Sequence, residues 1–403
     1  MQRRNTITAL LFLAALAAGF LLVLTSFLGG EGNLESLIKG LRQGPAGVLS
    51  LLEEGEAAVN KDLDRDHYFI QLYGGVQRLS GRRLIQDTSQ AANVVKLSDG
   101  SLNFVYLSSE PSQDVYPNAE QTIRLREYLD DLDIPFLFVL APQKIERGKD
   151  LLPTGVEDWN NENATRHLDT LAGGGVDCLD LRPVFEATPD YASWFFRTDH
   201  HWRPEGAFLA WQEVSALLEA NYGWATDPAL TDEANYEKIV YQDFFLGSQG
   251  KRVGSLYTGV DDITRYSPRF DTNLTYSIMD SGVVREGSFD VSVLFPERVE
   301  QRDWFNGNPY TLYSGGDYGF ARMVNHNNPE GPKILLIRDS FACAFAPFLA
   351  LSCSELITVD MRYLEPGSLP ETIAREAPDL VMTLYTAGTT ALPNMYAFFP
   401  EGQ

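Results

Sequence analysis

Two short segments of this chain carry residues that could together perform nucleophilic catalysis. The first, Thr198-Asp199-His200-His201-Trp202, places a carboxylate and an imidazole two positions apart. In an extended segment such residues point the same way, so Asp199 could fix the tautomer and orientation of His201. The second, Arg338-Asp339-Ser340-Phe341, follows about 140 residues later. Together they supply the serine, the general base and the carboxylate that an acyl-transferring serine enzyme needs.

The surroundings of Ser340 predict a strand-to-helix turn. An apolar run at 333–337 leads into it, and a second apolar run at 341–351 follows at once. Such a turn exposes the serine oxygen and directs free N–H groups of the helix start toward the same spot, where they suit an oxyanion. The alternatives are structural roles. Ser340 could serve solely as the cap of its helix, and Asp199 and His201 could form an ordinary structural hydrogen-bonded pair.

A metal site is another alternative for the first segment, because Asp199, His200 and His201 could all be ligands. The sequence offers no HxxxH spacing or cysteine pair to complete such a site, and ligand-like neighbours are missing around the other three histidines, His67, His167 and His326. We therefore expect neither a metal nor a cofactor. His200 points away from His201 in an extended segment and is expected to pack.

The elements that must position these residues alternate between strands and helices. Apolar runs predict strands at 134–140, 178–184, 333–337, 356–359 and 380–384, and helical patterns cover 119–131, 204–221, 341–351 and 370–376. This order predicts a parallel sheet with helices on both faces. Earlier in the chain, 67–107 has a β-like pattern beginning with a strand at Tyr68–Tyr73, and 224–330 is rich in loops and strands.

Functional groups in such sheets collect just beyond the carboxyl ends of the strands. That rule selects Pro142–Lys144, Ser340, Asp360–Arg362 and Tyr385-Thr386. We expect the 224–330 stretch to be an insertion that walls the same cleft.

The N-terminus predicts the compartment. Arg3 and Arg4 precede 22 uncharged residues from Ile7 to Leu28, enough to cross a bilayer as a helix with the N-terminus in the cytoplasm. We expect a signal anchor at 1–28, a juxtamembrane linker at 29–60 and one domain at 61–403, giving a single-pass cell-membrane protein with an extracytoplasmic C-terminal domain. A signal peptide cleaved near Ala15-Leu16-Ala17 is the alternative.

Composition restricts the partners. The chain has 403 residues, is 44% hydrophobic and carries a net charge of −23, or −25 without Arg3 and Arg4. Such a charge repels nucleic acid phosphates and disfavours a strongly anionic polymer as substrate. Three cysteines are too few for a disulfide framework.

The two motifs also carry a family resemblance. Thr198-Asp199-His200-His201-Trp202 with Pro204-Glu205-Gly206, together with the serine block Arg338 to Phe341, resembles the bacterial DHHW proteins, which belong with the SGNH-like proteins of alginate O-acetylation. Leu246-Gly247-Ser248, Val260-Asp261-Asp262 and the 359–363 segment extend the resemblance. It implies a flavodoxin-like, three-layer α/β/α core. It also implies a catalytic triad of Ser340, His201 and Asp199.

The resemblance leaves the oxyanion hole open. The usual Gly-Asp-Ser reads Arg338-Asp339-Ser340, so its glycine is missing, and the separate Gly and Asn donors of ordinary SGNH enzymes are not identified. Thr386 stands where the Asn is expected. The candidates for oxyanion or substrate binding are the backbone N–H near Ser340 and the side chains Arg362, Lys144, Thr386 and Trp202.

These observations predict a membrane-anchored, extracytoplasmic serine O-acyltransferase or esterase that acts on a cell-surface polysaccharide. Water and a sugar hydroxyl both stay open as acyl acceptors. The resemblance also implies a multi-spanning membrane O-acyltransferase as a partner that delivers acyl groups. The alternatives are a non-catalytic glycan-binding or assembly subunit of a polysaccharide- or cell-wall-modifying complex, and a metal-dependent hydrolase.

Overall fold

The computed structural model describes residues 67–86 and 93–400. The predicted anchor and linker at 1–60 lie outside the described residues, and no helix within the described ranges is long and apolar enough to cross a membrane. The chain divides into two units, 1–76 and 77–403. In the first, only residues 67–76 are described, and from Tyr68 on they belong to α4 (Tyr68–Leu79).

The expected strand at Tyr68–Tyr73 is therefore wrong. The run contains aromatic and aliphatic residues at consecutive positions, which a short strand and a helix accommodate equally well. The apolar pattern continues through Val76 and Leu79 at helical spacing, and Gly74 and Gly75 lie inside the helix rather than in a turn.

The second unit contains an eight-stranded sheet with the order β5-β4-β13-β11-β12-β10-β8-β9. The first five strands in that order are parallel, and the last three add antiparallel. Their bounds are β4 Phe136–Ala141, β5 Asp177–Asp180, β8 Leu274–Ile278, β9 Val283–Gly287, β10 Phe320–Asn325, β11 Lys333–Arg338, β12 Glu355–Val359 and β13 Leu380–Thr386.

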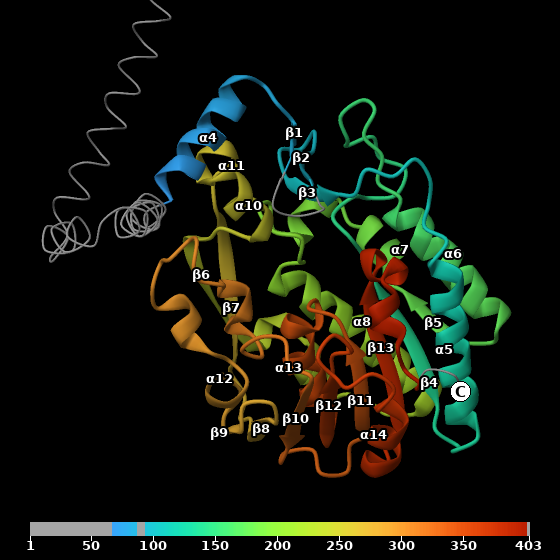
Figure 1. Cartoon of the computed structure of the whole chain (residues 1–403). Coiled ribbons are helices and arrows are strands. Elements are labelled where there is room, and N and C mark those ends of the chain that lie inside the picture. Colours follow the sequence, from blue (N-terminus) through green and yellow to red (C-terminus); the bar gives the residue numbers. More distant parts are fainter. Residues whose placement is uncertain (1–66, 87–92, 401–403) are drawn as a thin grey trace, which may run out of the picture. The chain divides into compact units, whose positions relative to one another are not determined.

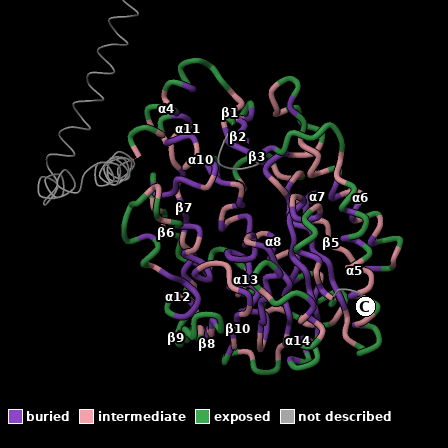
Figure 2. Tube along the Cα trace, viewed as in Figure 1, coloured by how far each residue is buried: buried purple, intermediate pink, exposed green. Residues whose placement is uncertain are grey.

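Helices cover both faces of this sheet, as expected (Figure 1). Alternate residues of a strand point to opposite faces. Leu137 and Val139 of β4 pack in one core with α8 (Pro204–Tyr222) and α13 (Ala342–Ser352). Phe136, Phe138 and Leu140 pack in the other core with helices α5 (Val115–Asp130), α6 (Asn160–Gly173) and α14 (Leu369–Glu376). Figure 2 shows the buried residues concentrated along the central strands.

The strand order differs from the expected flavodoxin-like order. Numbered by chain position, the five parallel strands β4, β5, β11, β12 and β13 lie in the order 2-1-5-3-4, whereas a flavodoxin-like sheet has the order 2-1-3-4-5. The last strand, β13, is inserted at the centre, between β4 and β11. Periodicity identifies strands but carries no information on which buried strands are neighbours.

The remaining strands and helices lie outside the eight-stranded sheet. Strands β1 (Leu84–Ile85), β2 (Asn93–Lys96) and β3 (Leu102–Val105) form one small sheet, and β6 (Tyr236–Phe245) pairs with β7 (Asp261–Pro268). The other α-helices are α7 Arg182–Glu186, α9 Pro228–Thr231, α10 Ser248–Val253, α11 Ser255–Thr258 and α12 Phe289–Ser292. The 3-10 helices are η1 Tyr191–Trp194, η2 Glu233–Asn235, η3 Pro296–Val299, η4 Pro309–Leu312, η5 Ala387–Ala391 and η6 Pro393–Tyr396.

Candidate active site

Ser340 lies on the tight turn between β11 and α13. Both carboxylate oxygens of the preceding Asp339 fix this turn: Oδ1 accepts from the Phe341 amide at 3.0 Å, and Oδ2 accepts from the Thr386 amide and the Thr389 hydroxyl, each at 2.8 Å. Burial raises the pKa of Asp339, and these donors partly offset that shift. Asp339 thus ties the serine turn to the carboxyl end of the neighbouring strand β13.

The Asp199–His201 segment meets Ser340 in a continuous hydrogen-bonded relay. Ser340 Oγ lies 2.7 Å from His201 Nε2, and His201 Nδ1 lies 2.5 Å from Asp199 Oδ1. A neutral imidazole with its proton on Nδ1 donates to Asp199 and accepts the serine proton through Nε2. The three side chains that sequence spacing selected are therefore in direct contact.

The carboxylate of Asp199 is buried and fully bonded. Its Oδ2 accepts from the Ser248 amide at 2.6 Å, and its Oδ1 also accepts from the His201 amide at 3.1 Å. Burial alone would raise the pKa of Asp199, but the His200 and His201 rings and these bonds hold it well below its usual range. Asp199 therefore stays ionised, as a group that orients and stabilises an imidazolium must.

A second aspartate holds the backbone just before this relay. Asp261 Oδ2 accepts from the Thr198 amide at 2.7 Å and from its hydroxyl at 2.6 Å, and Oδ1 accepts from the Arg197 amide at 2.9 Å. The Gly247 amide donates to Thr198 Oγ1 at 2.9 Å. A side chain at Gly247 has no room, since an added Cβ would lie 2.2 Å from Asp199 Cβ. The segments at 246–248 and 260–262 thus hold the Asp199 carboxylate in place.

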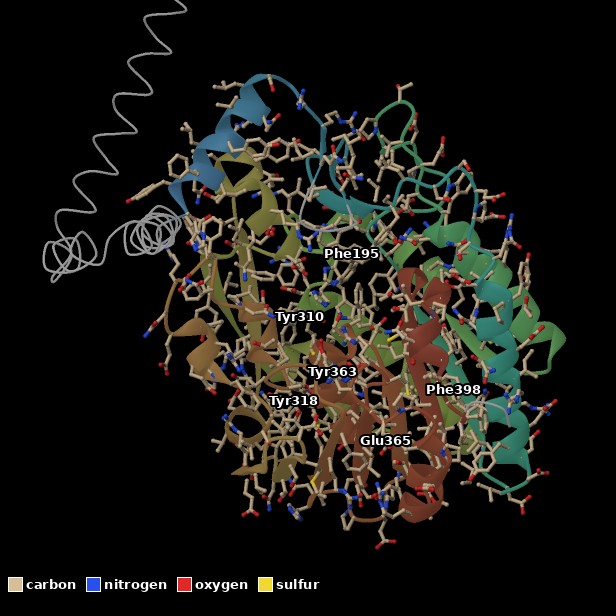
Figure 3. All side chains as sticks on the ribbon, in the orientation of Figure 1. Phe195, Tyr310, Tyr318, Tyr363, Glu365 and Phe398 are labelled. Carbon is tan, nitrogen blue, oxygen red and sulfur yellow. The ribbon has the colours of Figure 1, made fainter. Side chains whose placement is uncertain are left out.

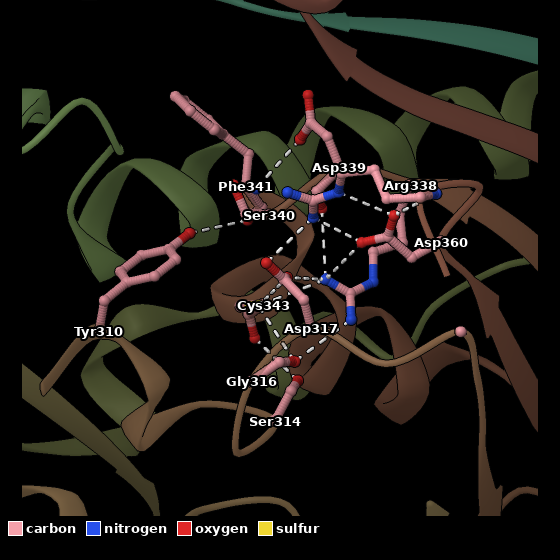
Figure 4. Close-up of polar contacts among 12 residues, drawn as sticks. Tyr310, Ser314, Gly316, Asp317, Arg338, Asp339, Ser340, Phe341, Cys343 and Asp360 are labelled. Carbon is pink, nitrogen blue, oxygen red and sulfur yellow. Dashed lines mark hydrogen bonds and ion pairs between the residues drawn. The ribbon is translucent and has the colours of Figure 1, made fainter. Parts of the chain in front are cut away.

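The His201 ring is held between two other rings. Tyr310 stacks on one side at 3.9 Å between centroids and 17° between planes, and His200 lies on the other at 3.9 Å and 35°. Tyr310 is buried (labelled in Figure 3) and donates its hydroxyl to the Phe341 carbonyl at 3.0 Å (Figure 4). Burial and the adjacent His201 lower the pKa of His200 to about 3, and its Nδ1 contacts Ser248 Oγ at 3.0 Å. His200 is thus a neutral packing partner at physiological pH.

Asp199, His200 and His201 also bring potential metal-ligand atoms within 4.8 Å of one another. Both ring nitrogens of His201 are already engaged in the relay, and both oxygens of Asp199 accept backbone donors. A metal ion at this point would have to break the contact with Ser340 or with Asp199. The donor set therefore fits a proton relay better than a metal centre.

Ser340 opens into a cleft of about 720 Å³. Its lining comes from the carboxyl ends of the strands, as expected, and from segments around β3, α5 and α6. The lining residues are Asn103, Phe104, Tyr106, Ser108, Glu110–Gln113, Gln143, Lys144, Asp158–Asn160, Asn163, His200, Asp339–Phe341, Arg362, Thr386, Gly388, Thr389, Ala391, Leu392 and Met395.

The expectation that the 224–330 insertion walls this cleft is wrong. None of the lining residues belongs to that segment. The insertion instead supports the relay from behind, through Ser248, Asp261 and Tyr310, and it extends the sheet with β8, β9 and β10. Its loop-rich composition indicated an insertion, but composition does not reveal which side of the catalytic residues a segment packs against.

Arg338 stands where the serine motif usually has glycine, and the fold accommodates its side chain by burial. Its guanidinium bonds to Asp317 and to the Gly316 carbonyl, with Asp360 at 3.8 Å (Figure 4). Burial favours the neutral acid, but Arg338 and Arg362 lower the pKa of Asp317 to about 2. The missing glycine is thus replaced by a buried ion network directly behind the nucleophile turn.

Two of the expected oxyanion donors have N–H groups without an acceptor among the described residues. The Phe341 amide donates to the Asp339 carboxylate and the Ala342 amide donates to the Asp339 carbonyl. The Ser340 amide has no acceptor among the described residues. Arg362, which lines the cleft and is about one-third exposed, bonds to Asp360 through Nε and Nη2, and Nη2 also lies 3.0 Å from Asp317. Its Nη1 keeps its donors available within the described part of the chain. Both expected candidates therefore lie at the site.

Two other expected substrate contacts need correction. Trp202 is fully buried, donates to the Phe341 carbonyl at 3.0 Å and stacks against Phe185, so it cannot stack on a sugar. Lys144 lines the cleft but is 3% exposed. Its Nζ donates hydrogen bonds to the Leu102 and Asp199 carbonyls and to Gln249 Oε1. Burial lowers the pKa of Lys144 to about 8, against the opposing effects of Asp261, Asp199 and Asp99.

Thr386 lies in the cleft wall, where its amide donates to Asp339 and its hydroxyl contacts Thr389 at 3.0 Å. It is a turn-fixing residue in this arrangement. Sequence analysis missed Tyr310 and Asp317, because neither lies near a motif and their role comes only from the way the insertion folds back.

Comparisons with known proteins agree with this architecture. A family model described as the SGNH hydrolase-like domain of acetyltransferase AlgX matches residues 105–239, and the DHHW protein model matches 187–359. No curated protein matches the chain.

Solved structures share the fold. Bacillus cereus PatB1 has a TM-score of 0.63 at 20% identity, covering 75% of this chain and 99% of its own, and its form with a sulfonyl adduct gives 0.61 at 19%, covering 76% and 100%. A DHHW family protein from Eubacterium siraeum gives 0.55 at 20%, covering 79% and 97%. This chain is thus similar to the DHHW proteins over residues 187–359 and to the SGNH hydrolase-like domain of acetyltransferase AlgX over residues 105–239.

Proposed function

We propose that this protein is an extracytoplasmic serine O-acyltransferase or esterase acting on a cell-surface polysaccharide, anchored to the cell membrane by its N-terminal segment. The observation that carries the proposal is the relay Ser340–His201–Asp199 at the floor of an open cleft. The matched acetyltransferase-type domain supports acyl transfer as the reaction class.

The reaction would proceed in two halves. Ser340 Oγ attacks the acyl carbonyl while His201 Nε2 takes its proton, and the oxyanion of the tetrahedral intermediate is bound by the Ser340 amide and Arg362. The intermediate collapses to an acyl-serine, and His201 returns the proton to the departing alkoxide. A sugar hydroxyl or water, deprotonated by His201, then attacks the acyl-serine carbonyl. The second tetrahedral intermediate collapses with cleavage of the bond between the acyl carbon and Ser340 Oγ, and His201 returns its proton to Ser340 Oγ. We include a multi-spanning membrane O-acyltransferase in the proposal as the source of acyl groups.

Hydrolysis of a chromogenic acetyl ester tests the proposal. The wild-type C-terminal domain should release the chromophore, and Ser340→Ala should abolish the catalysed rate. Catalysis that survives in Ser340→Ala, or none in the wild type, would refute the enzymatic proposal. The second result would favour the alternative of a glycan-binding or assembly subunit.

A further inference from the structure

The charges that line the Ser340 cleft suggest which polymers it accepts. Polar lining comes chiefly from amides and hydroxyls, among them Asn103, Ser108, Ser112 and Gln113. Tyr106, which is 61% exposed, and Trp159 add aromatic surface. Such a lining can pair with uncharged hydroxyl and amide groups and requires no ionic partner.

The cations of the lining offer no unbalanced positive charge. Within the described residues, Lys144 and Arg362 are the only lysine or arginine side chains of the lining, and the His200 ring is neutral. Lys144 is buried, with its ammonium bonded to two backbone carbonyls and to Gln249 Oε1 at 3.2 Å. Arg362 shares two carboxylates, those of Asp360 and Asp317, with the buried Arg338, so the two positive and two negative charges of this network balance. It therefore offers an N–H donor without net positive charge.

The anions of the lining are less well balanced. Asp158 accepts from Gln143 Nε2 and from the amide and side chain of Asn160, each at 3.1 Å, all neutral donors. Glu110, also in the lining, is exposed. A carboxylate-bearing ligand would bring its charge toward these two groups, and the guanidinium of Arg362 is the cation it could meet, its charge already balanced by Asp360 and Asp317.

We propose that the cleft accepts an uncharged sugar chain and discriminates against polyuronates and other anionic polymers. This inference rests on the proposed function and adds the charge class of the substrate. Repulsion between two partly solvated charges across a cleft changes a rate by roughly three- to ten-fold at low salt, and added salt screens it.

Two aryl acetates that differ in one remote charge provide the test: 4-acetoxybenzoate and its methyl ester. The kcat/KM of each is divided by its own rate of hydroxide-catalysed hydrolysis, so that intrinsic reactivity cancels. At low salt the normalised value for the anion should be at least about three-fold lower than for the neutral ester. The gap should narrow at high salt and in Glu110→Gln. The matched control Glu120→Gln, at an exposed position of α5 that is not among the cleft-lining residues, should leave the gap unchanged.

Equal or faster normalised turnover of the anion at low salt would overturn the inference while leaving the proposed function intact. Inhibition of neutral-ester hydrolysis by added polygalacturonate would overturn it as well, because a competing anionic polymer should not enter the cleft. No turnover of either ester would refute the proposed function, and this inference with it.

Discussion

The substitution Gly247→Ala should disable the site through a single methyl group. The backbone of Gly247 has φ near −72°, which alanine adopts freely, so the change introduces no conformational strain. The added Cβ would lie 2.2 Å from Asp199 Cβ and 2.6 Å from Asp199 Oδ2. Ordinary contact begins near 3.4 Å, so Asp199 or the 247 backbone must move by about 1.2 Å.

That displacement falls on the carboxylate that orients His201. Asp199 Oδ2 accepts a hydrogen bond from the amide of Ser248, the residue after the substituted position, at 2.6 Å. The movement therefore disturbs this supporting hydrogen bond as well as the carboxylate. A misplacement of about 1 Å at a catalytic group costs on the order of 100-fold. We therefore expect the kcat for a chromogenic acetyl ester to fall about 100-fold, or ~2.7 kcal/mol of transition-state stabilisation.

Steady-state kinetics with thermal unfolding separates this effect from misfolding. Gly173→Ala is the matched control, since Gly173 ends helix α6 and an added Cβ there has no heavy atom within 4 Å. The control should keep wild-type kinetics, and Gly247→Ala should keep a cooperative unfolding transition. A Gly247→Ala enzyme with a kcat within about three-fold of wild type would refute the reasoning, since the position of the Asp199 carboxylate would then not limit the rate.

Three further predictions follow from individual residues. Asp199→Asn should lower kcat by about 10³–10⁴-fold with little change in KM, because the amide favours the wrong tautomer of His201; a loss under ten-fold would contradict this role. Lys144→Met removes the hydrogen-bond donor of the buried Leu102 and Asp199 carbonyls, which costs ~1–3 kcal/mol of stability for each unpaired carbonyl. We expect kcat to fall at least ten-fold. An unchanged kcat would show that Lys144 does not position the loop that carries Asp199. Burial lowers the pKa of His167 to about 4 from an ordinary value of 6.5, so the unfolded chain binds the proton first as pH falls. The free energy of unfolding should drop by about 2 kcal/mol between pH 7 and pH 5 from this residue alone, and urea titrations of His167→Gln should lack that part of the decrease.

Local sequence pattern was sufficient to predict the elements that carry Asp199, His201 and Ser340. The helix predicted from Pro204 is confirmed, because Pro204 occupies the first turn and Gly223, with φ of +72°, ends it. The strand leading to Ser340 and the helix after it are confirmed for a similar reason: both are continuous apolar runs separated by polar residues. The catalytic spacing was readable since Asp199 and His201 interact within one loop.

Features of the fold and the site that depend on contacts between distant parts of the chain could not be predicted from the sequence. The central position of β13, the stacking of Tyr310 on His201 and the support from the 224–330 insertion all arise from which buried surfaces meet. Lys144 was misassigned for the same reason. A lysine that follows a buried strand suggests a cation available in the cleft. Only the fold reveals that the ammonium group donates its hydrogen bonds to buried backbone carbonyls.

The most direct test of the central claim is covalent labelling of the serine. Intact-protein and peptide mass spectrometry after treatment with a fluorophosphonate or sulfonyl fluoride should find one adduct, on Ser340, that forms far more slowly in His201→Ala. No adduct on Ser340, or an equal labelling rate in His201→Ala, would contradict an activated nucleophile at this position.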